Sequence, residues 1–225
     1  RGAWYLDGRT DIDSGNENDP NRNHPDPAKR ALCLPSGVGQ YDIPLVFQDK
    51  QIDSSGYLAF DQFATKGILG NKFCVNGKIQ PKFKVEGRKY RFRLLDGGPS
   101  RLYEFYLTDA RGTNLPFTYI ANDGNLLPAP LLNTKKVLLG TAERADIVID
   151  FSKYAPGTSV YLVNRLIQTD GRGPDPLVNI RDSTGLLIAA GTQILRFDVG
   201  AATYDPSQVP EKLRELPPIN LAEVV

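Results

Sequence analysis

Apolar and polar residues alternate with a repeat of two along much of the chain after residue 40. The clearest case is KYRFRL (89–94), where every second residue is aromatic or aliphatic and each residue between is basic. Such a repeat places alternate side chains on opposite faces of an extended strand. We therefore expect a half-buried strand whose inward side chains are Tyr90, Phe92 and Leu94.

Patterns of this kind predict an all-β fold. Asn76-Gly77 is a strong hairpin signal, and Pro44 indicates an edge strand or the start of a strand. Residues 60–68 are the one stretch that suggests a helix, a short one. Many strands separated by turns are typical of a Greek-key β-sandwich or barrel. The expected strands cover residues 41–49, 72–79, 89–95, 101–107, 117–124, 135–140, 144–151, 158–165, 184–190 and 192–199.

Both flanks differ in composition from this region. Residues 7–27 contain a single aliphatic residue, Ile12, and cannot bury enough apolar surface to offset their ordering entropy. We expect a long exposed loop or a mobile link there. GAWYL (2–6) is a short apolar strand whose sheet lies elsewhere, and the Pro-rich end of the chain has linker composition.

Composition and charge narrow the function classes. The chain has 225 residues, 40% of them hydrophobic, and a formal net charge of +1. It contains no apolar run long enough to span a membrane, and its near-neutral balance argues against a global nucleic-acid footprint. It begins at Arg1 and has no Met, so we expect a processed chain or a fragment.

The residues that usually carry chemistry are sparse. His24 is the single histidine and lies in the polar segment, so neither a Ser-His-Asp triad nor a site built from several imidazoles is expected. Asp146 and Asp150 are expected on the solvated face of a strand, and DGGPSR (96–101) is expected to form a turn. Cys33 and Cys74 either form one disulfide or remain two buried thiols.

The basic stretch from 78 to 93 allows two interpretations. It carries seven basic residues against one acid, Glu86, with aromatic residues interleaved, as in a single-stranded nucleic-acid surface. Stacking would require the aromatic and basic side chains to share a face, and here they alternate. The favoured interpretation is a barrel strand whose Lys89, Arg91 and Arg93 meet solvent, another domain or carboxylates.

Four phrases together resemble multicopper oxidases of the bilirubin oxidase and spore-coat laccase type. They are LPSGVGQYDIPLVFQDK (34–50), FCVNGKIQPKFKVEGRKYRFRLLDGGPSR (73–101), IANDGNLLP (120–128) and GTAERADIVIDFSKYAPG (140–157). The resemblance covers residues 32–200 and implies the middle of three cupredoxin domains. It assigns residues 1–40 to the end of a preceding domain and a polar linker, 41–200 to the middle cupredoxin domain, and 201–225 to a linker toward a following domain.

The family carries its type 1 copper and its trinuclear copper cluster on the first and third domains. The resemblance therefore implies copper in the complete enzyme, no copper ligand in this chain, and no catalysis by this chain alone. Electrons would pass from phenols, tetrapyrroles or metal ions to dioxygen, which becomes water. The implied partners are the flanking cupredoxin domains, the organic reductant and dioxygen, with no nucleic acid and no membrane, and the implied location is extracellular. Glu143 and Asp146 are candidate partners for the basic strand.

Residues 164–182 form a long segment rich in Gly, Pro and Asp between two expected strands. Loops of this length in compact domains are usually functional or disordered. By resemblance the loop lies near the type 1 copper, and Arg165, Gln168 and Arg172 are candidates for the rim of a substrate pocket. The rival interpretation of the whole chain is a stand-alone, copper-free cupredoxin-like module that serves as a binding or scaffold protein.

Overall fold

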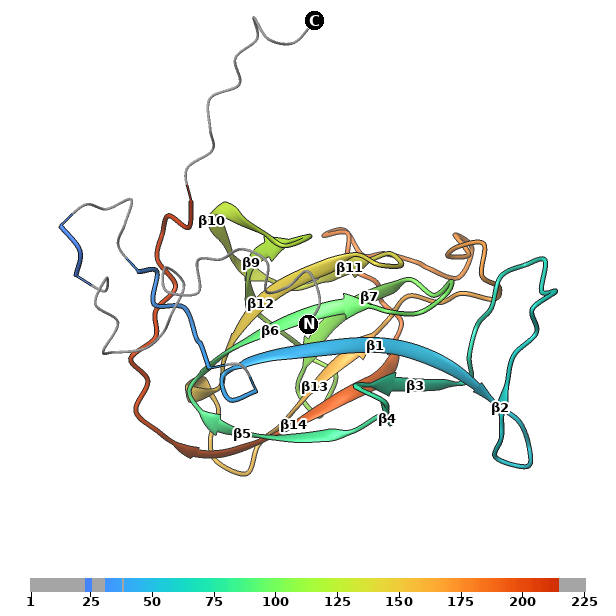
Figure 1. Ribbon diagram of the computed structural model, residues 1–225, viewed down its shortest axis with the longest axis horizontal. Coiled ribbons are helices and arrows are strands. Elements are labelled where there is room, and N and C mark those ends of the chain that lie inside the picture. The colour runs from blue at the N-terminus through green and yellow to red at the C-terminus, as the bar shows by residue number, and fades with distance from the viewer. Residues whose placement is uncertain (1–22, 26–30, 38, 215–225) are drawn as a thin grey trace, which may run out of the picture.

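Two β-sheets pack face to face and contain nearly all of the regular structure in this computed structural model (Figure 1). The structure describes residues 23–25, 31–37 and 39–214. The all-β prediction is confirmed, and each sheet mixes parallel with antiparallel pairs. Strand β1 (Asp42–Ile52) is parallel to β6 (Lys89–Asp96), and β14 (Thr192–Ala202) is parallel to β5 (Lys82–Gly87). Residues 2–6 and most of 7–27 lie outside the described part of the chain.

The eight-stranded sheet has the order β10-β9-β12-β6-β1-β3-β4, with β2 beside β1. Its strands are β1 (Asp42–Ile52), β2 (Leu58–Ala59), β3 (Lys72–Val75), β4 (Lys78–Ile79), β6 (Lys89–Asp96), β9 (Phe117–Asn122), β10 (Asn125–Thr134) and β12 (Arg144–Asp150).

The six-stranded sheet has the order β11-β7-β13-β14-β5, with β8 beside β7. Its strands are β5 (Lys82–Gly87), β7 (Tyr103–Thr108), β8 (Asn114–Leu115), β11 (Val137–Leu139), β13 (Ser159–Asn164) and β14 (Thr192–Ala202). A 3-10 turn, η3 (Phe151–Lys153), follows β12 and is capped by the side chain of Asp150.

Aromatic side chains from both sheets fill the core between them. Phe92 of β6 lies with its ring centroid 5.0 Å from that of Phe197 on β14, and Phe47 of β1 lies 4.5 Å from Phe105 on β7. The expected inward face of β6 is confirmed, because Tyr90, Phe92 and Leu94 are all buried. The buried aliphatic and aromatic side chains thus hold the two sheets together at the contact where their apolar faces meet.

Local turn chemistry agrees with the structure at the β3–β4 hairpin. Asn76 and Gly77 both have positive φ (48° and 80°), as the predicted tight turn requires. Pro44 lies near the start of β1, before β3 joins that strand at Phe47. The side-chain nitrogen of Asn76 donates to the Pro44 carbonyl (2.9 Å), and its side-chain oxygen accepts the Val46 amide (2.8 Å). These bonds stand in for backbone bonds to β3, which has not yet joined β1 there.

Two sequence expectations were wrong, and the strands β5 and β10 were not expected. Residues 60–68 form turns and no helix, because the Asp61 carboxylate accepts the amide of Phe63 and Gly67 has a φ of 75°. Residues 184–190 form no strand beyond the bridge between Leu187 and Arg181, and Leu187 is buried in a cluster with Tyr106 and Leu166. β10 was missed because two prolines, at 128 and 130, interrupt its pattern at a bulged sheet edge.

The outer face of β6 is largely buried and its arginines are paired with carboxylates. Arg91 is 3% exposed and donates to Asp146 on β12 (2.6 and 3.0 Å), while Arg93 donates to Asp42 on β1 (2.7–3.1 Å). Asp146 is therefore a buried ion-pair partner, and its expected place on a solvated face was wrong. Its candidate pairing with the basic strand was right.

Glu143, the other candidate, bonds elsewhere: its carboxylate accepts the amide of Gly140 (2.6 Å). The partner of Lys89 comes instead from the segment after β14, where Asp205 accepts its ammonium at 2.8 Å and its amide at 3.0 Å. Arg88 also binds Asp205 (3.1 Å) while its guanidinium lies 3.5 Å over the ring of Tyr41. Arg88, Lys89, Arg91 and Arg93, four of the seven basic residues between 78 and 93, are thus paired with carboxylates.

Segments from before β1 and from after β14 cover the outer face of the eight-stranded sheet. Leu34 from before β1 and Leu213 from after β14 are buried together against Ala121 and Val148. The Gln208 amide donates to the carbonyl of Cys33 (2.7 Å), which joins the two covering segments directly. The sheet therefore has an apolar layer on each face, and the charged pairs of β6 are enclosed by the outer one.

The buried pair Arg91–Asp146 gives a direct stability test. Arg91→Ala leaves the Asp146 carboxylate without its main cation in a buried position, so we expect the free energy of unfolding to fall by about 3–5 kcal/mol. Chemical denaturation measures this, with exposed Lys84→Ala on β5 as the control, expected within about 0.5 kcal/mol of the parent. The double substitution Arg91→Met with Asp146→Leu should recover most of the loss. Equal, small effects of Arg91→Ala and Lys84→Ala would contradict the buried pair.

Candidate functional site at the loops of one end

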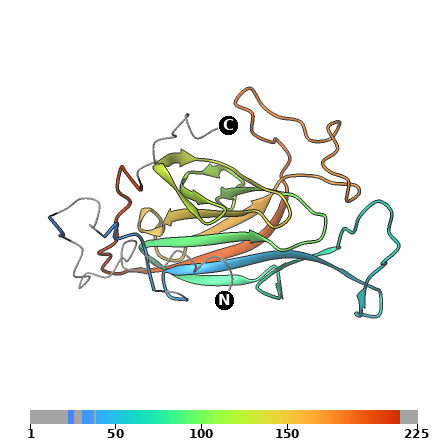
Figure 2. The same cartoon turned by 45° about the horizontal axis from the view of Figure 1, so that its top comes forward.

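Two long connections gather at one end of the sandwich (Figures 1 and 2). One comprises residues 53–71, between β1 and β3 and including the short β2, and the other comprises residues 165–191, between β13 and β14. They meet where the amide of Gly171 donates to the carbonyl of Lys66 (2.7 Å). A Cβ on Gly171 would lie 2.7 Å from the Cα of Gly67, so this junction requires glycine.

A buried glutamate anchors the 165–191 loop to β7. Glu104 is 1% exposed and receives both terminal nitrogens of Arg181 at 2.6 and 2.7 Å, with the hydroxyl of Tyr106 at 2.5 Å. Lys136 lies 3.5 Å away. Burial by itself raises the pKa of Glu104, but the hydrogen bonds from Arg181 and Tyr106 outweigh it and the net pKa is lowered. Glu104 thus stays ionised and holds the loop by charge-assisted hydrogen bonds.

Arg165, the first of the expected rim residues, is directed into the domain. It is 8% exposed, and its guanidinium lies 4.6 Å from the centre of the Tyr106 ring. Its terminal nitrogens donate to the carbonyls of Gly112 (3.0 Å) and Leu187 (3.2 Å). This arginine joins the loop to the sheet and to the turn after β7.

Gln168 and Arg172 differ in their contacts. The Gln168 carboxamide accepts the amide of Leu102 (2.6 Å) and donates to the carbonyl of Ser100 (3.3 Å), which fixes it against the sandwich. Arg172 is exposed, and its backbone amide bonds the carboxylate of Asp170 (2.9 Å). Of the three expected rim residues, Arg172 is the one whose side chain lies at the surface.

A pair of buried carboxyl groups lies at the base of the same end, and the sequence analysis missed it. Asp96 and Asp49 are 0% and 4% exposed, and each continues the inward parity of its strand, β6 and β1. A Cβ on Gly98 would lie 3.2 Å from Oδ1 of Asp96 and 3.3 Å from Oδ1 of Asp49, so both carboxyls flank this glycine. A carboxylate at an apolar position of the two-residue repeat was the available signal.

An arginine, Arg101, binds one member of this carboxyl pair. Arg101 donates to Oδ2 of Asp49 at 2.7 Å, whereas Asp96 receives the amide of Gly98 at 2.9 Å. Oδ1 of Asp49, Oδ2 of Asp96 and the hydroxyl of Tyr103 are buried without a hydrogen-bond partner among the described residues. The pKa of Asp96 is raised to about 7, mainly by burial and also by the charges of Asp49 and Glu143, while the Gly98 amide and Arg101 oppose the shift. The site therefore holds a proton within the neutral pH range.

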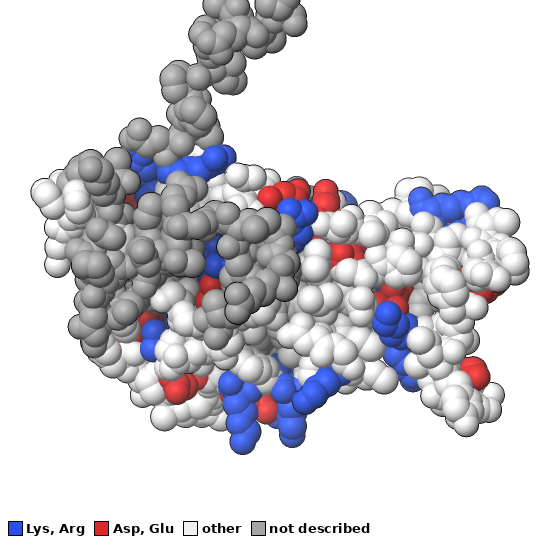
Figure 3. Space-filling model, viewed as in Figure 1, with Lys and Arg blue, Asp and Glu red and all other residues white. Residues whose placement is uncertain are grey.

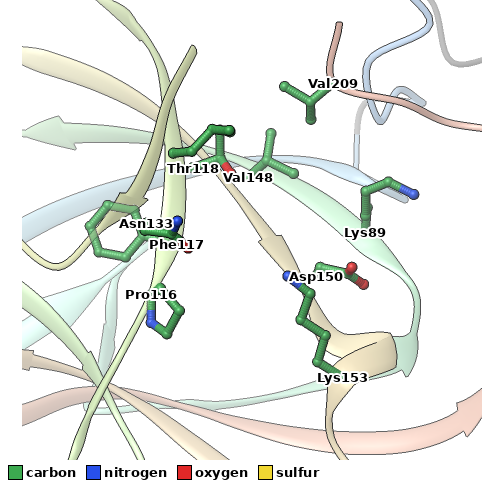
Figure 4. Close-up of a pocket in the computed structure, with 10 residues that line it drawn as sticks. Lys89, Pro116, Phe117, Thr118, Asn133, Val148, Asp150, Lys153 and Val209 are labelled. Atoms are coloured by element: carbon green, nitrogen blue, oxygen red, sulfur yellow. The ribbon is translucent and has the colours of Figure 1, made fainter. Parts of the chain in front are cut away.

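A second hollow, of about 340 Å³, lies on the outer face of the eight-stranded sheet (Figure 4). Figure 4 shows Lys89, Asp150 and Lys153 on one side of it, opposite Pro116 and Phe117. The ammonium of Lys89 is bound by Asp205, and the Asp150 carboxylate also lines the hollow.

The donors of this chain do not fit a copper centre. Among residues 23–25, 31–37 and 39–214, no three His, Cys, Asp or Glu side chains are grouped so that they could hold a metal ion. The sequence offers one His and no Met, and Cys33 and Cys74 are both buried without forming a disulfide. In the described part of the chain, no helix has the length and apolarity needed to cross a membrane.

Comparison with known proteins identifies the relatives. The chain is 39% identical over 196 residues to bilirubin oxidase of Albifimbria verrucaria, an alignment that covers 85% of this chain and 32% of that protein. The McoA multicopper oxidase of Aquifex aeolicus, in its 2F4 variant, superposes with a TM-score of 0.69 at 30% identity, over 87% of this chain and 39% of that one. These matches show that the chain is similar to one part of multicopper oxidases of the bilirubin oxidase and laccase type. The cupredoxin-like fold expected from the resemblance is thereby confirmed.

Other relatives carry two different names. A laccase of Haloferax volcanii is 36% identical over 143 residues, covering 61% of this chain and 24% of that protein. The cell division protein FtsP of Xenorhabdus nematophila is 35% identical over 146 residues, covering 63% of this chain and 30% of that protein. No protein-family model matches the chain. The chain spans about a quarter to a third of the length of these curated relatives.

The carboxyl pair predicts a pH dependence of stability. The pKa of Asp96 is about 7 in the folded chain, whereas its reference value is 3.8. Between pH 4 and pH 7 the folded chain therefore keeps a proton on Asp96 that the unfolded chain loses. This contribution to stability is present in full below pH 4 and is lost as the pH rises through 7, at most about 4 kcal/mol. Asp96→Asn mimics the protonated carboxyl, so we expect it to remove this loss.

Denaturant unfolding at pH 5.5 and pH 8 measures the effect. The parent should lose stability between the two values, and Asp96→Asn should lose less. Exposed Glu211→Gln, in the segment after β14, is the control and should keep the parent's difference. An unchanged difference in Asp96→Asn would show that Asp96 does not hold the proton.

Proposed function

We propose that this chain is the middle, copper-free cupredoxin domain of a multicopper oxidase. The 39% identity with bilirubin oxidase over 85% of the chain carries the proposal. In the complete enzyme, copper would accept electrons from phenols, tetrapyrroles or metal ions and deliver them to dioxygen. Residues 1–40 would end a preceding domain, 41–200 would form the middle domain, and 201–225 would lead to a following one. An extracellular location belongs to the same proposal and rests on resemblance.

The chain's own residues would position other parts of the enzyme. The buried charge pairs of β6 and the anchored loops make a rigid body, which suits a domain that spaces two others. The donor set supports this role, since one histidine cannot provide the imidazoles of a type 1 or trinuclear copper site. The copper would therefore be held by the flanking domains.

The 165–191 loop is proposed to contribute to the rim of the substrate pocket. Arg172, whose side chain is exposed, would bind an anionic substrate directly. Arg165 and Gln168 are engaged with backbone groups of the sandwich, so they would act by holding the loop in place. These two are positioning residues in this proposal.

Copper content tests the domain assignment. The complete protein, loaded with copper and desalted, should retain several copper ions per chain, whereas residues 1–225 treated in the same way should retain none. Elemental analysis of both forms gives the answer. A complete protein that binds no copper would favour the stand-alone module, and stoichiometric copper in the 225-residue chain would place a copper site here.

Substrate kinetics test the rim. In the complete enzyme, Arg172→Ala should raise KM for an anionic substrate about two- to fivefold, because it removes one exposed charge contact. The KM for a neutral substrate, kcat and copper content should stay the same. Arg172→Lys should recover part of the effect, and exposed Arg111→Ala, at the turn after β7, is the matched control. If Arg172→Ala has the same KM and kcat as the parent for both substrates, the rim role is ruled out.

A further inference from the structure

A further hollow, of about 350 Å³, lies beside the buried carboxyl pair of Asp49 and Asp96. Asp49 itself lines this hollow, together with the turn of residues 97–99. Most of the remaining wall is apolar and comes from β2 and the residues that follow it: Leu58, Ala59, Phe60 and Ile68. An apolar hollow of this size with a few converging polar groups is the usual form of a small-molecule site.

Three buried oxygens beside the hollow have no hydrogen-bond partner among the described residues. They are Oδ1 of Asp49, Oδ2 of Asp96 and the hydroxyl of Tyr103, whose residues are 4%, 0% and 1% exposed. The hydroxyl lies near both carboxyls, since burial and then the charges of Asp49 and Asp96 raise the pKa of Tyr103. Buried polar groups are nearly always bonded, so three unbonded oxygens in one place point to a ligand.

Gly98 leaves the approach to the carboxyls open. A Cβ at this position would lie 3.2 Å from Oδ1 of Asp96 and 3.3 Å from Oδ1 of Asp49, closer than ordinary van der Waals contact. The φ of Gly98 lies outside the left-handed region, so its backbone conformation does not require glycine. Because Gly98 also lines the hollow, its missing side chain connects the hollow with both carboxyls.

Arg101 holds the pair in place without using all of its oxygens. Its Nε donates to Oδ2 of Asp49 (2.7 Å), and a terminal nitrogen donates to the carbonyl of Gly70 (3.0 Å). The Gly70 amide binds the same Oδ2 (2.6 Å), which leaves Oδ1 of Asp49 over. Lys50 also lines the hollow, but its parity on β1 is opposite to that of Asp49, so its side chain leaves from the other face of the sheet. Two carboxyls and one guanidinium therefore give the site excess negative charge when both carboxyls are ionised.

The chemistry of the site selects a ligand with an apolar body and one cationic head. On the side shown in Figure 3, the end that carries β2 is largely uncharged at its surface, so the negative charge lies inside, next to the apolar hollow. A primary ammonium offers three N–H donors and no acceptor, which matches the three unpartnered oxygens. A guanidinium presents five donors in a fixed plane and would leave some of them unpaired.

We propose that this hollow binds a small primary alkylammonium ion. The ammonium would donate to the three unpartnered oxygens, and the alkyl chain would lie against Leu58, Phe60 and Ile68. Charge-assisted hydrogen bonds to the carboxyls supply the affinity. The site requires neither copper nor a flanking domain, so this inference stands apart from the proposed function.

A proton on Asp96 competes with the ligand. The pKa of Asp96 is about 7 in the folded chain, where burial and the charges of Asp49 and Glu143 raise it and Arg101 lowers it. Above pH 7 the ionised carboxyl attracts the ammonium, and below pH 7 the proton removes that attraction. The alkylammonium keeps its charge at pH 8, because its pKa is close to that of lysine. Binding should therefore be about tenfold tighter at pH 8 than at pH 6.

Calorimetric titration of the 225-residue chain with n-hexylammonium chloride tests the site. At pH 8 we expect one ion bound per chain, whereas hexan-1-ol, which has the same alkyl chain without the charge, should bind about tenfold more weakly. Asp96→Asn should weaken hexylammonium binding about tenfold and remove its pH dependence. Gly98→Ala should weaken it by a similar factor, because its methyl group would stand between the carboxyls. Exposed Glu211→Gln is the control and should keep the parent's affinity.

The location of the bound ion is measured separately. The amide of Gly98 donates to Asp96 (2.9 Å), so its NMR resonance should shift during the titration with the affinity found by calorimetry. Thermal midpoints of the variants distinguish loss of the site from loss of the fold. If Gly98→Ala does not fold, the results for Asp96→Asn, hexan-1-ol and pH decide.

Three results would overturn the proposal. Equal binding of hexylammonium and hexan-1-ol means that the hollow is apolar without an ammonium site. Unchanged affinity in both Asp96→Asn and Gly98→Ala places the binding elsewhere. Full competition by sodium chloride at the same concentration means that an inorganic cation is the occupant.

Discussion

Two crossed arginine–aspartate pairs organise the centre of the eight-stranded sheet. Arg91 lies opposite Asp42 in the β1–β6 register but binds Asp146, and Arg93 lies opposite Asp146 in the β12–β6 register but binds Asp42. Each pair is a diagonal contact between adjacent strands. The three central strands are thus joined by side chains as well as by the backbone ladder. A shift of β6 by one residue would move both arginines to the apolar face and break both pairs.

Burying these charges has a consequence for the segments outside the sandwich. Ion pairs in a low-dielectric environment must be well hydrogen-bonded to offset the loss of hydration. The segments around Leu34 and Leu213 close the face, and Asp205 adds the partner for Lys89 and Arg88. Hydrogen bonds from Lys89 and Ser207 outweigh burial and lower the pKa of Asp205 to about 2. Residues that resemble linkers in composition therefore complete the packing of the domain.

Buried carboxylates also form ion pairs at the end of the sandwich that carries the two long loops. Glu104 accepts a hydrogen bond from Arg181 of the 165–191 loop, and Asp49 accepts one from Arg101 beside the base of residues 53–71. Both acids are buried and project from strands, so they fix loops to a rigid support. Asp96 differs because no cation binds it directly within the described chain, and its raised pKa follows from that difference. Buried carboxylates in this way hold both loops to the sandwich.

The sequence by itself determined the all-β fold, the inward face of β6 and the β3–β4 hairpin. These features depend on local periodicity and turn chemistry, which neighbouring residues in the chain encode. It also revealed Asp146 as a partner of the basic strand, through resemblance and charge. The tertiary structure alone decided that Arg91 is buried, that Asp205 and not Glu143 completes the charge pairing, and that Arg165 points inward. It also brought Asp49 and Asp96 together. Those outcomes depend on which distant segment covers a given face, and a two-residue repeat carries no information about what lies above it.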